Sequence, residues 1–210
     1  MKILFIGNSH TYFNDMPYMF AELMRASGTE VEITMLTRGG QTIKGHIANE
    51  QTRFNILYGN YDYVILQENT SKFPDAKTYT DDVSVVLGWC KRAGVPLGLY
   101  MNFEAPKDTP SLEYLRNGVL SAAETLSLPV ARVGEAFAKA KEELPHLYLH
   151  HTDHHHANAF GSYLIALTVA HGIFGADVFG LPSVISYKGD TLVSLSSDDA
   201  SVLQKIAQSL

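Results

Sequence analysis

The chain has a single cysteine, Cys90, which excludes an intramolecular disulfide framework. It also lacks an apolar run long enough to span a bilayer, so we expect no membrane partner. No cluster of lysine and arginine is present and the formal net charge is -6, which argues against nucleic acid as a partner. No long tract rich in Pro, Gly or Ser separates one part of the chain from another. We therefore expect residues 1–210 to form one domain.

The first residues, MKILFIG, contain too short an apolar stretch for a secretion signal, and no cleavage site of small residues follows. This pattern favours a cytoplasmic location.

Short apolar runs alternate with segments of helical period along the chain. The expected strands are 3–7, 31–37, 61–67, 96–103 and 128–133. The expected helices are 17–28, 81–94, 111–126 and 159–175, with a last one after a cap at Ser197 or Asp198. Strands that alternate with helices imply parallel pairing, right-handed crossovers and helices on both faces of the sheet. We therefore predict a three-layer α/β/α sandwich with a central, mostly parallel, five-stranded sheet.

Polar segments follow the expected strands. They are GNSHT at 7–11, RGGQT at 38–42, QENTS at 67–71 and NFEAP at 102–106; HHTDHHHAN at 150–158 precedes the apolar helix 159–175. In open parallel sheets the ligand site forms beyond the carboxyl ends of the strands. We expect one face of that apolar helix to pack on the sheet, which would bring its N-terminal end near the other loops. The segment from Asp177 onward is expected to form an accessory edge that serves as a lid or an oligomer contact.

Two of these loops carry the residue types of nucleophilic catalysis. Ser9 follows a strand directly, two positions after a glycine that lets the backbone bend, so its hydroxyl is expected at the sheet edge. A helix cap is the alternative role for this serine. Asp153 lies three residues before His156, where a carboxylate can bind the imidazole N–H and fix its tautomer. Ser9, His156 and Asp153 are thus the candidate nucleophile, base and orienting carboxylate.

The chain here resembles the SGNH hydrolases, also called the GDSL esterase/lipase family. GNSHT matches the nucleophile block, GGQT the glycine block with Gly40, and DHHHANAFGSYLIA the final block with Asp153 and His156. The resemblance covers residues 3 to 170. It implies a flavodoxin-like α/β/α fold and hydrolysis of an ester by Ser, His and Asp. Where the family has GDS this chain has GNS, and Asn8 can make most of the hydrogen bonds of that turn.

The resemblance also implies an oxyanion hole. Two of its donors would be the backbone N–H groups of Ser9 and Gly40. The family's third block, G-x-N-D, is absent, and the matching strand ends in LQENTS. Either Asn69 or Gln67 could therefore supply the third donor, and Asn69 is preferred. Glu68 lies between them, where its carboxylate would repel an oxyanion unless it points away or pairs with a cation such as Arg38.

The run HLYLHHTDHHHAN contains six histidines, so a metal site was weighed against the hydrolase. Adjacent histidines project in different directions, and neither H-E-x-x-H nor a paired Cys/His spacing is present. We therefore expect no metal and no cofactor. His154 and His155 are interpreted as turn or rim residues.

Substrate-binding candidates lie in the same loops. His10 could line the acyl pocket. Tyr12 and Phe103 could form an apolar or sugar-stacking wall together with the other aromatic residues of these loops, Phe13, Phe73 and Tyr100. For His10 simple exposure is the alternative, and His46 is interpreted as an ordinary helix-surface histidine.

The function that fits these patterns is a serine esterase acting on a small acyl ester, with an O-acetylated carbohydrate as one candidate. Its partner would be a small-molecule or carbohydrate ester. An acyl thioesterase is the alternative within the enzymes. Outside them, the alternative is a non-catalytic flavodoxin-like module that binds a carbohydrate or nucleotide, because the third block is altered. The oligomeric state is left open.

Overall fold

The computed structural model describes residues 1–210 and contains one central sheet of five strands, all parallel. In spatial order the strands are β2 (Glu32–Thr37), β1 (Lys2–Gly7), β3 (Tyr63–Gln67), β4 (Leu97–Tyr100) and β5 (Val130–Ala131). The chain order reverses between β1 and β3, and loops diverge at such a switch point at the carboxyl ends of the strands. A ligand site is therefore expected at the segment that follows β1.

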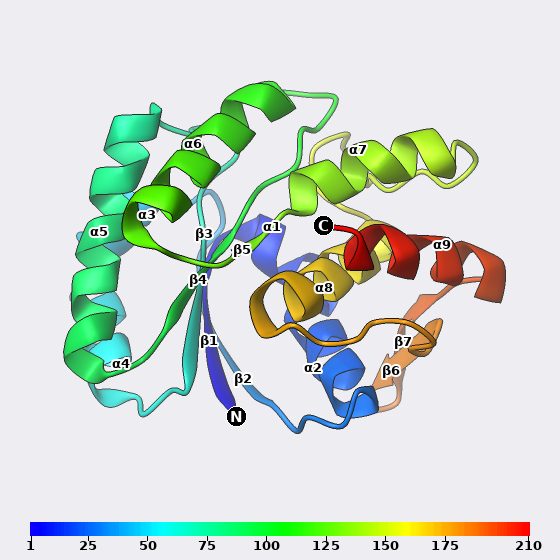
Figure 1. Cartoon of the computed structure of the whole chain (residues 1–210), viewed down its shortest axis with the longest axis horizontal. Coiled ribbons are helices and arrows are strands. Elements are labelled where there is room, and N and C mark those ends of the chain that lie inside the picture. The colour runs from blue at the N-terminus through cyan, green and yellow to red at the C-terminus, as the bar shows by residue number, and fades with distance from the viewer.

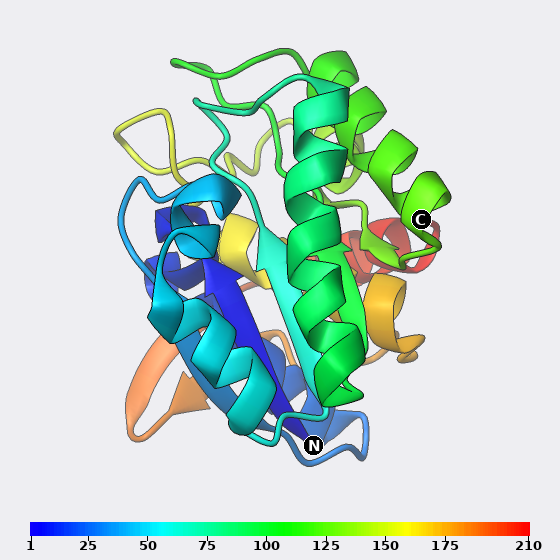
Figure 2. The same cartoon turned by 90° about the vertical axis from the view of Figure 1, so that its left-hand side faces the viewer.

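Helices cover both faces of this sheet, as Figures 1 and 2 show. One layer contains α2 (Met16–Ala26), α7 (Val133–Glu143), α8 (Ala159–Phe174) and α9 (Ser197–Gln208). The other contains α3 (Ile43–Ile47), α4 (Glu50–Tyr58), α5 (Ala76–Ala93) and α6 (Leu112–Leu126). A short helix, α1 (Ser9–Tyr12), and the 3-10 turn η1 (Phe13–Asp15) follow β1. The predicted three-layer sandwich is confirmed.

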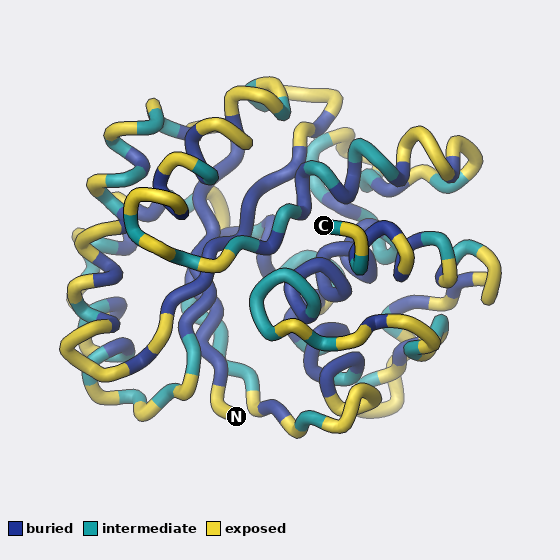
Figure 3. Tube along the Cα trace, in the orientation of Figure 1, coloured by how far each residue is buried: buried dark blue, intermediate teal, exposed yellow.

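Strand β1 shows why its sequence is an uninterrupted apolar run. Its side chains alternate between the two faces of the sheet. Ile3 and Phe5 are buried in the core beneath α2 and α8, whereas Leu4 and Ile6 are buried in the core beneath α5. Both cores need apolar residues, so the strand has no polar face. Figure 3 shows the resulting pattern, in which the sheet is buried and the outer sides of the helices are exposed.

Two expected strands are shorter in the structure. β4 ends at Tyr100, and beyond it the Met101 N–H still donates to the Ala131 carbonyl of β5 at 3.0 Å. β5 consists of Val130–Ala131 because α7 begins at Val133. The sequence analysis did not predict α7, although its buried residues Val133, Ala136, Phe137 and Ala140 have helical spacing.

The last part of the chain covers α8. The strands β6 (Val184–Tyr187) and β7 (Asp190–Ser194) form an antiparallel hairpin, and α9 follows after Ser196, whose hydroxyl accepts a hydrogen bond from the Asp199 N–H. The expected cap at Ser197 or Asp198 is therefore wrong by at least one residue. Because α9 and the hairpin pack on the outer side of α8, residues 161–170 are buried all round, not on one face as expected. No helix of the structure has the length and apolar character needed to cross a membrane.

Candidate active site

The turn after β1 carries Ser9 at the carboxyl edge of the sheet (Figure 1). Asn8 caps α1: its side-chain oxygen accepts from the His10 N–H at 3.0 Å. Glycine is needed at position 7 because a Cβ there would lie 2.4 Å from Thr11 Oγ1 and 2.5 Å from Gln67 Oε1. Close approach of neighbouring side chains, not an unusual backbone bend, therefore requires this glycine. The cap predicted as an alternative role for Ser9 belongs to Asn8.

The segment 150–158 forms a closed turn before α8. A bridge joins His150 to Ala157, and the His151 N–H donates to the His156 carbonyl at 2.7 Å. Inside the turn, Asp153 Oδ1 accepts from the backbone N–H groups of His155 and His156, at 2.9 and 3.0 Å. The carboxylate is thus oriented by the same turn that presents the histidine.

These two segments meet, so Ser9 and His156 are in contact although 147 positions separate them. The Ser9 Oγ lies 2.8 Å from His156 Nε2, and His156 Nδ1 lies 2.7 Å from Asp153 Oδ2. Burial acts to raise the pKa of Asp153, but the hydrogen bonds from the His156 ring and from two backbone N–H groups outweigh it and hold that pKa below its ordinary value. A carboxylate therefore faces Nδ1, which places the ring proton there and leaves the Nε2 lone pair toward the serine hydroxyl.

Two residues hold the histidine in place: Phe13, expected instead in a substrate wall, and Asn14, which no sequence pattern singles out. Phe13 stacks on the His156 ring with a centroid distance of 4.2 Å and an interplanar angle of 9°. Asn14 donates to the Ala157 carbonyl and to Ser162 Oγ, both at 2.9 Å, and adopts a φ of 55°. The only local signal for Asn14 is an asparagine between two helical segments, a residue type that tolerates positive φ. Its partners, more than 140 positions away, cannot be inferred from spacing.

Gln67, one of two candidates for the third oxyanion donor, points into the protein. Its Oε1 accepts from the Asn8 N–H at 3.0 Å and from the Thr11 hydroxyl at 2.9 Å. Its Nε2 contacts the Glu68 carbonyl and Asn102 Oδ1. The side chain is completely buried. Gln67 therefore supports the Ser9 turn from below and has no amide free for an oxyanion, so this alternative is wrong.

Asn69 keeps an available amide. Its side-chain oxygen accepts from the Lys72 N–H at 3.0 Å, and its nitrogen makes no hydrogen bond within the protein. Gly40 lies in an exposed turn with a φ of 68°, a conformation that glycine adopts without strain. A hydrogen bond joins the turn of Gly40 to the turn of Ser9, because Asn8 Nδ2 donates to the Gln41 carbonyl at 2.9 Å. Gly40 and Asn69 remain predicted oxyanion donors.

Glu68 is buried and points toward the start of α3. Its carboxylate accepts from the Ile43 N–H at 3.1 Å and from the Asn69 N–H at 2.5 Å. Burial raises the pKa of Glu68 to about 7, against the lowering effect of these two backbone hydrogen bonds. Arg38 is exposed and makes no ion pair with it. Of the two arrangements expected for Glu68, the structure therefore has the one in which the carboxylate turns away.

The substrate-binding candidates have different surroundings. Phe103 is completely buried and stacks on Phe137 at 4.1 Å, so its prediction as a substrate wall is wrong and it belongs to the core. The Tyr12 hydroxyl lies beside Gly39 in the glycine turn, and its role in binding substrate stays a prediction. His46 is buried and donates from Nε2 to the Gly7 carbonyl at 2.8 Å, so it is not the surface histidine that was expected. Phe103 and His46 were thus misjudged because packing, not local pattern, buries them.

His10 is 5% exposed, so the alternative of simple exposure is wrong. Its Nε2 lies 3.1 Å from His155 Nε2, and its Nδ1 is buried without a hydrogen-bond partner. One nitrogen from each of His10, His155 and His156 lies within 4.8 Å of the other two. This is the group of side chains that could hold a metal ion.

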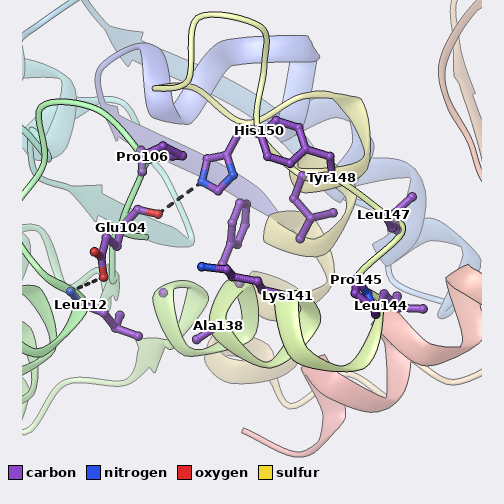
Figure 4. A pocket seen from close by; sticks show the side chains of 14 residues that line it. Glu104, Pro106, Leu112, Ala138, Lys141, Leu144, Pro145, Leu147, Tyr148 and His150 are labelled. Carbon is purple, nitrogen blue, oxygen red and sulfur yellow. Dashed lines mark hydrogen bonds between the residues drawn. The ribbon is translucent and has the colours of Figure 1, made fainter.

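A separate cavity of about 480 Å³ lies behind the histidine loop, between α7 and the residues around 105 and 147 (Figure 4). Its lining is mostly apolar, with Glu104, Lys141 and His150 as polar members. His150 Nε2 donates to the Glu104 carbonyl at 3.3 Å and so joins the two loops that border the cavity. Neither Ser9 nor His156 contributes to its lining.

Comparison with known proteins gives structural matches: no family model and no curated protein sequence matches the chain. A DUF4886 family protein from Bacteroides uniformis matches with a TM-score of 0.76 and 17% identity, over 100% of this chain and 93% of that one. The lipase/acylhydrolase from Enterococcus faecalis gives 0.66 and 16%, over 83% and 95%. The psychrotrophic esterase EstA from a Pseudoalteromonas species gives 0.61 and 14%, over 83% and 97%.

The chain therefore has the fold of the G-D-S-L lipolytic proteins, to which several of the matching structures belong. The resemblance to the SGNH hydrolases that the motif blocks indicate is confirmed in the fold. At these identities the likeness concerns the fold alone, and function has to be argued from the site.

Proposed function

We propose that this protein is a serine esterase that hydrolyses a small acyl ester through an acyl-enzyme intermediate. One observation carries the proposal: the hydrogen-bonded chain from Ser9 Oγ through His156 to Asp153, with distances of 2.8 and 2.7 Å. A nucleophile bonded to a base, and a base oriented by a third group, is the arrangement that activates a serine hydroxyl.

Acylation begins with attack of Ser9 Oγ on the ester carbonyl carbon. The hydroxyl proton passes to His156 Nε2, and Asp153 stabilises the imidazolium that results. As the tetrahedral intermediate collapses, the bond to the leaving alkoxide breaks and His156 returns the proton to that oxygen. The first product is an alcohol, and the acyl group stays on Ser9.

The negative charge that develops on the carbonyl oxygen needs donors. The backbone N–H groups of Ser9 and Gly40 and the side-chain amide of Asn69 are the proposed set. Gln67 cannot take part because its side chain is bonded beneath the Ser9 turn. One such donor typically contributes about 10²- to 10³-fold to turnover.

Deacylation repeats the same steps with water. His156 takes a proton from the water as its oxygen attacks the acyl carbon, and then gives that proton to Ser9 Oγ as the acyl bond breaks. The carboxylic acid leaves and the serine hydroxyl is restored.

The proposed substrate is a small-molecule or carbohydrate ester with a short acyl group, an O-acetylated carbohydrate being one candidate. Support comes from the cavity of about 480 Å³ between α7 and the histidine loop, which has neither Ser9 nor His156 in its lining. A long acyl chain would need such a cavity at the nucleophile. Matching structures described as a lipase/acylhydrolase and an esterase agree with ester hydrolysis as the reaction class.

Labelling with a fluorophosphonate probe tests the nucleophile. We expect the wild type to be labelled and Ser9→Ala to remain unlabelled. Ser71→Ala is the matched control, because Ser71 is exposed in the loop after β3, at the same edge of the sheet. It should be labelled like the wild type. Absence of labelling in the wild type would exclude the esterase and favour a binding module.

A second experiment compares turnover of acetyl, butyryl and octanoyl esters and of acetylated sugars, with Ser9→Ala as the blank. Short-chain preference is the expected result. Higher turnover of octanoyl than of acetyl esters would contradict the proposed acyl length without affecting the triad.

A further inference from the structure

Three histidine rings surround one point at the proposed active site. The ring centroids of His10, His155 and His156 are 4.7, 4.9 and 5.0 Å apart in pairs, which makes the arrangement nearly equilateral. His10 comes from the segment after β1, whereas the other two come from the turn before α8. Tertiary structure alone gathers them.

We propose that His10, His155 and His156 bind a Zn²⁺ ion that inhibits the enzyme by occupying the nitrogen that activates Ser9. The inhibition rests on the proposed function, whereas the metal site rests on the geometry of the three rings.

The separation of the nitrogens fits zinc. Two imidazole nitrogens bound at 2.0–2.1 Å in a tetrahedral site lie about 3.3–3.4 Å apart. His10 Nε2 and His155 Nε2 are already 3.1 Å apart. His156 offers the third nitrogen of the set, which lies within 4.8 Å of a nitrogen of each of the other two rings, and zinc binding would need a rotation of the His156 ring toward them.

The hydrogen bonds made by the other ring nitrogens of His155 and His156 also fit a zinc site. Histidines that ligate zinc usually donate their other ring N–H to a carboxylate or a backbone carbonyl. His156 Nδ1 faces Asp153 at 2.7 Å, and His155 Nδ1 faces the Lys107 carbonyl at 3.3 Å. With the proton at Nδ1, each ring has a lone pair at Nε2, which faces His10 in the case of His155 and Ser9 in the case of His156.

His10 can also offer a lone pair to the ion if its ring proton moves from Nε2 to Nδ1. Without metal, its Nε2–H donates to the lone pair of His155 Nε2, and its buried Nδ1 is left without a partner. With zinc bound, the proton resides on Nδ1 and the Nε2 lone pair faces the ion. Three neutral imidazoles then bind the ion, leaving one position for water or for the Ser9 hydroxyl.

The consequence for catalysis follows from His156. The lone pair that zinc would bind is the one that accepts the Ser9 proton, since Ser9 Oγ lies 2.8 Å from the same Nε2. A single atom cannot bind the ion and act as the base. Zinc and turnover therefore exclude each other.

Binding is measured first, by titration calorimetry with Zn²⁺ as the only ligand. Wild type, Ser9→Ala and His154→Asn should each bind one ion. His155→Asn should bind at least about tenfold more weakly, the smallest loss typical even for outer contacts of a metal site. His154 is the matched control because it is the neighbouring histidine but pairs outward with the Tyr148 hydroxyl at 3.0 Å. Asparagine tolerates the positive φ of that position.

Inhibition is measured next, with a short-chain ester and with chelator added afterwards. We expect reversible inhibition of the wild type and of His154→Asn, and a shift of at least about tenfold in the inhibitory concentration for His155→Asn, each protein being compared with its own turnover in the absence of zinc. Equal binding by His155→Asn and the wild type, binding without inhibition, or activation by zinc would overturn the proposal. Stoichiometric zinc binding by a wild-type protein that shows no esterase activity would instead refute the proposed function and keep the metal site.

Discussion

The turn at 150–158 and the end of β3 at 67–70 both contact the segment that carries Ser9, but they differ in burial and in chemistry. In the first, His156 reaches Ser9 from a partly exposed loop, with one hydrogen bond on each side of its ring. In the second, Gln67 is buried and bonds the backbone of Asn8. One region supplies the groups proposed to transfer protons, whereas the other combines Gln67, which holds the Ser9 turn in place, with Asn69, the proposed oxyanion donor.

This difference explains why the two regions should respond differently to mutation. Removal of a proton-transferring group from a loop should abolish turnover and leave stability intact. Removal of a buried amide leaves its partners without hydrogen bonds, so the free energy of unfolding should fall. Kinetics and stability measured on the same variants therefore separate the two regions.

The largest effect is expected for His156→Ala. Without the base, turnover of p-nitrophenyl acetate should fall by about 10⁴-fold or more, since triad members act as a unit. Thermal unfolding should change little because the ring is partly exposed. His154→Asn is the control, because asparagine tolerates the positive φ of position 154, and it should keep its activity. Loss of activity in His154→Asn, with His156→Ala active, would show that the base is misassigned.

Asn69→Ala comes next. The proposed loss of one oxyanion donor should lower kcat by about 10²- to 10³-fold with little change in KM. Fluorophosphonate labelling should slow in parallel, because the phosphonyl oxygen uses the same donors. A kcat within a few fold of wild type would remove Asn69 from the oxyanion hole.

Gln67→Leu should act mainly on stability. The Asn8 N–H and the Thr11 hydroxyl lose their shared acceptor, and each buried unsatisfied group costs about 1–3 kcal/mol. Urea unfolding measures the change, with the exposed Gln51→Leu as control, expected within about 0.5 kcal/mol of wild type. Equal stabilities of the two variants would contradict the supporting role of Gln67.

The smallest effect concerns pH. Burial raises the pKa of Glu68 from 4.5 to about 7, so the folded protein binds this proton more tightly than the unfolded chain. The stability contributed by the protonated carboxyl is complete below pH 4.5 and is lost as the pH rises through 7. The difference in unfolding free energy between wild type and Glu68→Gln should therefore fall over this range, by at most about 1.4 kcal/mol per pH unit.

Urea unfolding at pH 5 and pH 7.5 tests this slope. Glu142→Gln, in which the replaced side chain is exposed, should show no such pH dependence relative to wild type. A pH-independent difference for Glu68→Gln would mean that this carboxyl is ionised throughout.

The sheet and most helices were predictable because local pattern carries them. The five apolar runs became the five strands, since a sheet covered on both faces needs apolar residues at every position of its central strands. Helix α7 was missed although its apolar residues have helical spacing. The strand before it, β5, has only two residues, and no cap or turn residue in the sequence marks where the strand ends and the helix begins. Helix α8 was expected to bury one face, but α9 and the β6–β7 hairpin cover the rest.

The site residues, too, include some that local sequence could predict and some that it could not. The pairing of Asp153 with His156 was accessible because it spans three positions of one turn. Gln67 and Asn69 could not be told apart, since both end the same strand and only their partners differ. Phe103 was wrongly placed at the surface because its burial depends on Phe137, in a helix that the pattern did not reveal.

Local sequence was therefore sufficient for the strands and for the pairing of carboxylate and imidazole in the final loop, because each depends on residues a few positions apart. The approach of His156 to Ser9, the inward turn of Gln67 and the gathering of His10 with His155 depend on contacts across 56 to 147 positions. Only the packing of α8 and the loops against the sheet brings such distant residues together, and no spacing along the chain encodes that distance.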